Sequence, residues 1–150
     1  MRIYLAVIDE TEEAQIALRF AARRALDSAG RVHILALVPK QQFSAFSAVQ
    51  ETIEQEARDR AEVIANSAAG SLFAELGRMP TITVKEGDPE EIVRAYLDEH
   101  PEVTGLVLGA ADENNPGPLV THFSQRAGGL PCPLIIVPGS LTQEQIDQGR

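Results

Sequence analysis

The sequence predicts an α/β protein: one domain on a doubly wound, five-stranded parallel sheet, with helices on both faces in a Rossmann-like arrangement. Two observations lead to this fold class. Short apolar, β-rich segments alternate with helical patterns from one end of the chain to the other, as βαβ units require. The length of 150 residues suits a single domain over 1–150, and no linker or internal repeat divides it.

The first half of the chain contains two predicted strand–helix units. In order, they are a strand over 2–8, a helix over 11–28, a strand over 32–38, a loop over 40–46 with Phe43 and Phe46, and a helix over 47–76. Thr11 is a suitable N-cap, and Gly30 fits the stop that follows the first helix. Apolar residues three or four positions apart define the buried face of each helix. These residues are Ala14, Leu18, Ala21, Ala22 and Ala25 in the first helix, and Val49, Ile53, Ala57, Ala61, Ile64, Ala68 and Leu72 in the second. Gly70 is expected to bend or interrupt the second helix.

The second half repeats the alternation. It contains a strand over 81–84, a helix over 89–99, a strand over 105–110, a helix over 119–127, a strand over 134–137 and a polar tail over 138–150 with at most a loose helical turn. Asp88-Pro89-Glu90-Glu91 is the clearest helix start, because it places Asp at the N-cap, Pro at N1 and Glu at N3, as in a capping box.

Five strands in this sequence of elements predict the spatial order 3-2-1-4-5 with right-handed crossovers. The switch point of such a sheet lies between the first and fourth strands. Ligands bind at this crevice in open α/β sheets, outside the carboxyl ends of the strands. The order places Asp9, at the end of the first strand, beside Gly109, near the end of the fourth. The start of the helix near Gly117 adds free N–H groups at 119–121, which suit an anion.

Composition excludes several classes of function. The net charge of −9 disfavours binding to nucleic acid or to an anionic membrane surface. No apolar run approaches the roughly 20 residues of a membrane span, and no signal peptide is visible. The single cysteine, Cys132, reads as a buried small hydrophobe and allows no internal disulfide, which favours a reducing, cytoplasmic location. The three histidines do not have metal-ligand spacing, His33 and His100 read as structural, and no catalytic constellation is present.

Four segments together resemble the universal stress protein family. They are Val7-Ile8-Asp9-Glu10-Thr11, Glu86-Gly87-Asp88-Pro89, Leu106-Val107-Leu108-Gly109, and Leu130-Pro131-Cys132-Pro133 with the strand after it. The resemblance spans nearly the whole chain. It implies a stress-response protein that pairs into a homodimer through its last strand.

The resemblance also implies a place for ATP or AMP. Members that bind ATP carry the signature Gly, two residues, Gly, nine residues, Gly and Ser or Thr after the fourth strand. Here Gly109 matches the first glycine, whereas Asp112 and His122 stand at the second and third. The loop is therefore degenerate, and its two carboxylates, Asp112 and Glu113, would repel a phosphate.

Two hypotheses follow from the sequence. In the first, the protein is a non-enzymatic adaptor with a degenerate nucleotide-binding loop. In the second, it is a switch that binds AMP or ATP, with slow or no hydrolysis. The candidate nucleotide-binding residues are Asp9, Val38, Gly109, Gly117, Thr121 and Ser124. Asp9 has an alternative role as a cap for the turn into the first helix.

Overall fold

The computed structural model describes residues 1–39 and 47–149, and its centre is one sheet of five parallel strands. The elements are β1 (Ile3–Ile8), α1 (Glu12–Asp27), β2 (Arg31–Val38), α2 (Ser47–Leu76), β3 (Thr81–Glu86), α3 (Pro89–Glu99), β4 (Gly105–Ala110), α4 (Pro118–Gln125), the 3-10 turn η1 (Ala127–Gly129), β5 (Leu134–Pro138) and α5 (Gln143–Asp147). The strand order β3-β2-β1-β4-β5 confirms the predicted order. The predicted loop over 40–46 lies outside the described residues.

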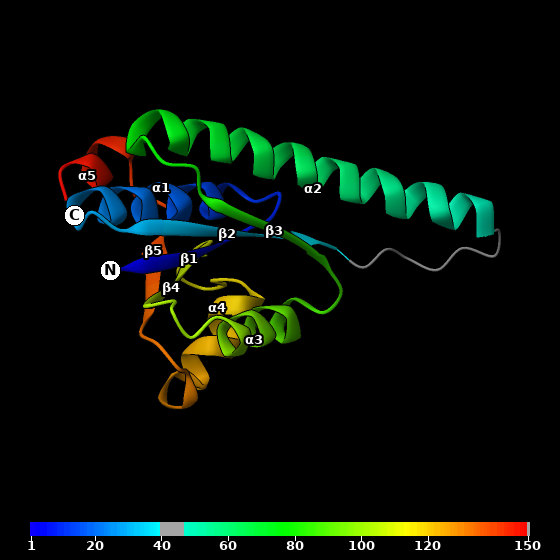
Figure 1. Cartoon of the computed structure of the whole chain (residues 1–150). Helices are drawn as coiled ribbons and strands as arrows, with labels where there is room; N and C mark the ends of the chain where they lie inside the picture. Colours follow the sequence, from blue (N-terminus) through cyan, green and yellow to red (C-terminus); the bar gives the residue numbers. More distant parts are fainter. Residues whose placement is uncertain (40–46, 150) are drawn as a thin grey trace.

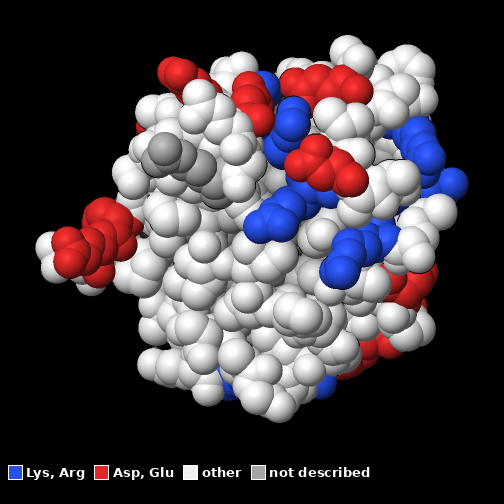
Figure 2. All heavy atoms as spheres, turned by 90° about the vertical axis from the view of Figure 1, so that its left-hand side faces the viewer, with Lys and Arg blue, Asp and Glu red and all other residues white. Residues whose placement is uncertain are grey.

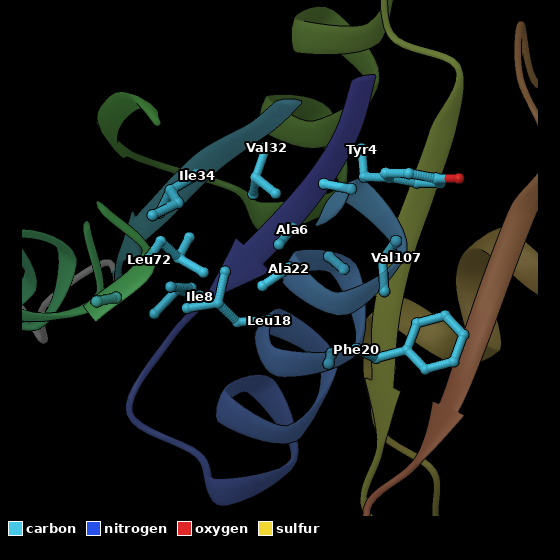
Figure 3. Packing of buried hydrophobic residues seen from close by; sticks show 14 of the residues in the cluster. Tyr4, Ala6, Ile8, Leu18, Phe20, Ala22, Val32, Ile34, Leu72 and Val107 are labelled. Carbon is cyan, nitrogen blue, oxygen red and sulfur yellow. The ribbon is translucent and has the colours of Figure 1, made fainter. Parts of the chain in front are cut away.

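Helices cover both faces of the sheet. In Figure 1, α1, α2 and α5 lie on one side, and α3 and α4 lie on the other. Each side has its own apolar cluster against the sheet. Figure 3 shows the cluster under α1, where Leu18 and Ala22 point toward Ala6 and Ile8 of β1. The central strand β1 is thus buried on both faces, which explains its continuous apolar sequence.

Helix α1 forms where the sequence places it. The Thr11 hydroxyl accepts a hydrogen bond from the Ala14 N–H at 3.3 Å, so Thr11 is the N-cap. The predicted apolar face is buried throughout; its members are Ala14, Leu18, Ala21, Ala22 and Ala25. Because most of these residues are alanines, the helix axis can lie close to the sheet.

Helix α2 matches its predicted bounds, but two expectations about it are wrong. The helix continues through Gly70 without interruption. Val49 belongs to the predicted apolar stripe and is nevertheless 48% exposed, whereas Ala57, Ala61, Ala68 and Leu72 are buried. Figure 1 gives the reason, since the amino-terminal part of α2 extends beyond the carboxyl ends of β2 and β3.

One helix cap and both ends of α4 differ from the predictions for local reasons. Asp88 caps α3 through the Glu90 N–H, one residue earlier than a capping box with Glu91 requires. Helix α4 begins at Pro118 and ends at Gln125, because a 3-10 turn takes over at Ala127.

The tail is more structured than predicted. Thr142 and Gln145 form a capping box at the start of α5. Ile146 is 1% exposed and packs in the cluster under α1. Asp147 accepts hydrogen bonds from the Arg19 guanidinium at 3.0 and 3.1 Å. The tail therefore closes one side of the core.

His33 and His100 have structural roles. The His33 ring is 8% exposed, and its Nδ1 lies 2.8 Å from the Tyr96 hydroxyl. His100 stacks on Tyr96 with ring centroids 3.9 Å apart. The Cys132 thiol is half-buried against the α3–α4 side of the core, and burial raises its pKa. The two histidines and Tyr96 join α3 to the sheet, and neither they nor Cys132 line the crevice at the strand ends.

Candidate functional site

The crevice predicted at the switch point is present. Strands β1 and β4 are neighbours, and the sheet order reverses between them. A cleft of about 100 Å³ lies beside their carboxyl ends. Among the six candidate residues, Asp9, Gly109 and Gly117 line this cleft together. The topology brings Asp9 to Gly109 and Gly117, which lie 100 or more positions away in the sequence.

Asp9 caps the turn into α1. Its Oδ1 accepts hydrogen bonds from the Thr11 N–H at 2.9 Å and from the Thr11 hydroxyl at 2.5 Å. The same hydroxyl oxygen accepts the Ala14 N–H, so carboxylate and hydroxyl form a short relay that fixes the start of the helix. Asp9 therefore has its alternative predicted role, as a cap for the turn into α1. Its Oδ2 has no hydrogen-bond partner among the described residues.

Gly109 is required by the packing of α1 on β4. A side chain at this position would overlap the main-chain carbonyl of Glu13. Gly139 makes a similar approach, because a Cβ there would lie 2.6 Å from the Ala110 carbonyl oxygen. Both glycines therefore let α1 and the ends of β4 and β5 come together, whether or not a ligand is present.

The loop after β4 is closed by a carboxylate. Asp112 Oδ1 accepts hydrogen bonds from the N–H groups of Asn114 at 2.9 Å and Asn115 at 2.6 Å. The Ala111 N–H donates to the Pro116 carbonyl at 3.0 Å and joins the two ends of the loop. Asp112 stands where the family signature has its second glycine. Its side chain satisfies N–H groups of the loop that would otherwise be available to an anion.

Gly117 is the N-cap residue of α4, with φ of +110° and no side-chain capping hydrogen bond. Leu119 and Val120 have the N–H groups that a helix start leaves without an intrahelical acceptor. The Thr121 N–H, also expected to be free, donates to the Gly117 carbonyl at 3.1 Å. The anion-binding capacity of this helix start is therefore smaller than predicted.

The other three candidates lie apart from the cleft. Val38 is 1% exposed and packs with Ala57 and Ala61 under α2. Thr121 lines a second, more open cleft that shares Gly117 with the first. Ser124 lies in neither cleft, and its hydroxyl donates to the Thr121 carbonyl at 3.3 Å.

The electrostatics of the cleft are acidic. Asp9 and Glu13 line it, and no Lys or Arg is among its described lining residues. Arg60 reaches the neighbouring Glu10 instead, at 3.0 Å. Glu13 is a lining residue that the sequence analysis did not single out. Its position could have indicated this, because Glu13 lies four residues after Asp9, in the first turn of α1.

Two further features, His122 and a larger cleft, lie outside the cleft at the strand ends. His122 lies 3.0 Å from a Glu90 carboxylate oxygen, so it joins α4 to α3 at the rim of the second cleft. A larger cleft of about 500 Å³ lies between α1 and α2, away from the strand ends. Its charged groups, Arg19 and Glu75, pair with each other at 3.0 Å.

Residues 1–39 and 47–149 contain neither a membrane-spanning helix nor a metal-binding cluster. No helix there has the length and apolar content needed to cross a bilayer. In the same residues, no group of three side chains is arranged to hold a metal ion.

Comparisons with known proteins agree with this architecture. Residues 1–138 match the model of the universal stress protein family. The universal stress protein UspA from Lactobacillus plantarum has a similar structure, with a TM-score of 0.78, 19% identity, and coverage of 91% of this chain and 97% of that one. A search of curated protein sequences gave no match.

Two further similar structures hold nucleotides, according to their descriptions. One is a universal stress protein in complex with cAMP, with a TM-score of 0.64, 14% identity, and coverage of 93% and 98% of the two chains. The other is a family protein from Arabidopsis thaliana with AMP bound, with a TM-score of 0.56, 13% identity, and coverage of 92% of each chain.

Proposed function

Since the chain belongs to the universal stress protein family, we propose that it is a non-enzymatic, cytoplasmic stress-response adaptor whose nucleotide site has lost its affinity for ATP. The observation that carries this proposal is the Asp112 carboxylate folded into the loop after β4. It fills the position where the ATP-binding signature has a glycine, and it uses the local N–H groups itself.

Charge supports the same conclusion. A phosphate in this cleft, beside Asp9 and Glu13, would meet carboxylates without a compensating cation among the described lining residues. Each carboxylate within 4–6 Å of a phosphate charge costs roughly 1 to 4 kcal/mol before screening, depending on the local dielectric. A triphosphate would incur this cost several times.

The test is thermal unfolding with ATP, ADP and AMP, each with and without Mg²⁺. A ligand at 100 times its dissociation constant stabilises a protein by about 2.7 kcal/mol. We expect no shift in the unfolding midpoint at millimolar ATP. An ATP-dependent shift in the wild type that disappears in Asp9→Asn would contradict the proposal.

A gain-of-function variant makes this test sharper. Asp112→Gly removes the carboxylate and restores the second glycine of the signature. We expect this variant to respond to ATP more than the wild type does. Glu113→Gly is the matched control, because it removes a neighbouring charge but leaves the hydrogen bonds of Asp112 in place.

A second candidate function has one observation in its favour. Asp9, Gly109 and Gly117 line one cleft, and two similar structures are described with AMP or cAMP bound. In this alternative, the protein is a switch that binds a nucleoside monophosphate, with Val38 offering backbone groups and Thr121 or Ser124 near the phosphate. Calorimetric titration with AMP and cAMP separates the two, since the adaptor requires neither ligand.

The adaptor is proposed to work as a homodimer through β5. This strand forms one edge of the sheet and pairs only with β4 among the described strands. Ile136, at its centre, is 41% exposed, although isoleucine is usually buried. An exposed apolar edge strand is a ready template for pairing with a second copy.

A further inference from the structure

The amino ends of the strands carry a surface unlike the acidic crevice at their carboxyl ends. In a parallel sheet, every turn from a helix into a strand lies at the same edge. Residues just before β1, β2 and β3 are therefore neighbours, because these three strands are adjacent. We define the amino-edge surface by five residues at or near these strand starts: Arg2, Leu26, Arg31, Arg78 and Met79.

The register places these residues side by side. The Arg31 N–H donates to the Arg2 carbonyl at 2.9 Å, so the starts of β1 and β2 are directly joined. Thr81, the first residue of β3, pairs with His33, so Met79 lies two residues before β3 and Arg31 two residues before the paired His33. Leu26 lies in the last turn of α1, which leads into Arg31.

The cations of this surface differ from most other arginines of the described residues, although Arg24 and Arg126 also lack an ion pair. Five arginines elsewhere lie within 3.5 Å of a carboxylate oxygen; they are Arg19, Arg23, Arg58, Arg60 and Arg94. Arg2, Arg31 and Arg78 are exposed and have no ion pair in the part of the chain that the structure describes. A protein with a net charge of −9 thus leaves three guanidinium groups at this edge without an ion pair, although Asp27 and Glu102 lie nearby.

Apolar side chains lie among these cations. Met79 is 63% exposed and Leu26 is 47% exposed. Figure 2 looks onto this side of the molecule and shows blue side chains, with red ones among them, bordering a broad uncharged area. Methionine and arginine are enriched in protein interfaces, where apolar contact and bidentate hydrogen bonds to carboxylates act together.

We propose that the amino-edge surface docks an acidic amphipathic segment of a partner protein. Carboxylates of the segment pair with Arg2, Arg31 and Arg78, and its apolar side chains cover Leu26 and Met79. This inference rests on the proposed adaptor function and gives it an interaction surface, at the edge of the sheet opposite the nucleotide crevice.

The alternative polyanions fit less well. The surface offers no aromatic side chain on which a base could stack. Its five residues contribute only three cations, against a net charge of −9 that repels a long nucleic acid or an anionic bilayer. Asp27 and Glu102 also lie near this edge, where Asp27 pairs with Arg23 and the charge of Glu102 acts on His33. A short segment can place its carboxylates between these acids.

The experiment uses a fluorescein-labelled synthetic peptide of Glu and Leu, spaced as an amphipathic helix, and measures binding by fluorescence anisotropy. One control peptide replaces Glu with Gln, and another replaces Leu with Ser. We expect the wild-type protein to prefer the Glu/Leu peptide over both controls. Raising NaCl from about 50 to about 300 mM should weaken binding severalfold, because the charges are exposed.

Variants of the protein locate the site. Arg31→Glu with Arg78→Glu should weaken binding about tenfold or more at low salt. Arg78 lies outside the strands. Arg78→Glu alone and Met79→Ser should each weaken peptide binding by a smaller factor. Arg58→Glu with Arg60→Glu, on α2, is the matched control and should leave the affinity within about twofold of wild type. Circular dichroism checks that each variant is folded.

Several results would overturn the inference. These are equal binding of the Glu and Gln peptides, no loss in the double Arg31→Glu, Arg78→Glu variant, or tighter binding to duplex RNA or to phosphatidylserine vesicles than to the peptide. The nucleotide test is independent of this one. A response to ATP with intact peptide binding would contradict the proposed function alone, and absent peptide binding without a response to ATP would contradict only this inference.

Discussion

At the scale of single residues, the crevice is shaped by local constraints that also act without a ligand. Gly109 is the clearest case, because it faces a main-chain carbonyl of Glu13 that cannot retreat without moving α1. Asp9 and Asp112 each satisfy backbone N–H groups of their own turns. A residue that matches a family motif at this crevice can therefore be explained by packing or capping alone.

Gly109→Ala should destabilise the fold. The added Cβ meets backbone, so the strand or helix must shift, and overpacking of this kind costs about 1–3 kcal/mol or more. Gly128→Ala is the matched control, because a Cβ there meets nothing within 4 Å and its φ is not positive; its effect should stay within about 0.5 kcal/mol. Urea unfolding measures both. Equal stability of the two variants would show that α1 does not pack as closely on β4 as described.

His33 should make stability sensitive to mild acid. Burial lowers the pKa of His33 below its usual value near 6.5, partly offset by Glu102 and reinforced by His100 and Arg31. The unfolded chain then binds the proton more readily than the folded one. This contribution to stability is fully present above about pH 6.5 and is lost as the pH falls below that value toward the folded pKa.

The measurement for His33 is the urea midpoint between pH 8 and pH 5. The midpoint of His33→Gln should fall less steeply below about pH 6.5 than that of the wild type, since glutamine does not titrate. The comparison at pH 8 gives the separate, pH-independent cost of changing the contact with Tyr96. Parallel profiles for the two proteins would remove His33 as the source of acid sensitivity.

At the scale of elements, α2 shows how one helix can satisfy two different environments. Its carboxyl-terminal half packs small residues against the sheet, whereas its first turns lie beyond the strands. Gly70 lies within the helix and Gly77 lies just after its end, with φ of +69°. Glycine is therefore unfavourable at position 70, inside the helix, and favourable at position 77, where φ is positive.

Alanine at these two positions should change stability in opposite directions. Gly70→Ala adds a methyl group in open space and should stabilise by about 0.5–1 kcal/mol, because glycine is a poor helix former. Gly77→Ala forces a left-handed conformation on alanine and should destabilise by about 1–2 kcal/mol. Thermal or urea unfolding distinguishes the signs. A loss of stability in Gly70→Ala would indicate that the space beside Gly70 is filled in solution.

At the scale of the whole molecule, the sheet has two different ends and one open apolar edge. The carboxyl ends of β1 and β4 hold the acidic crevice, and the amino ends of β1 to β3 hold unpaired arginines. The β5 edge presents Ile136. These three surfaces are separate, so a dimer through β5 leaves both ends of the sheet accessible.

The dimer is testable by light scattering at protein concentrations on the order of tens of micromolar. We expect a dimer for the wild type and a monomer for Ile136→Lys, because a charge in a buried apolar edge is costly. Val63→Lys is the matched control, since Val63 is 68% exposed on α2, away from β5. A wild-type monomer, or a dimer that is unaffected by Ile136→Lys, would contradict pairing through this strand.

The sequence predicted the fold class, the strand order and the bounds of α2. It also predicted that Asp9 and Gly109 lie in the same crevice at the switch point. These features depend on periodicity, caps and chain connectivity, which are local or topological properties. The sequence did not predict that Val38 is enclosed under α2, that the tail docks through Ile146, or that the Thr121 N–H is already bonded. The first two depend on how one element packs on another, and the third depends on where α4 begins.

The sequence by itself determined that this protein is a doubly wound α/β domain of an acidic, universal-stress-like type with an incomplete glycine signature. Only the tertiary structure decided what the remaining residues of that signature do. The reason is that Glu13 and Gly109 are far apart in the sequence, and only packing brings the Glu13 carbonyl against the α-carbon of Gly109. The same packing decides which charges find partners, and so which arginines remain free at the amino ends of the strands.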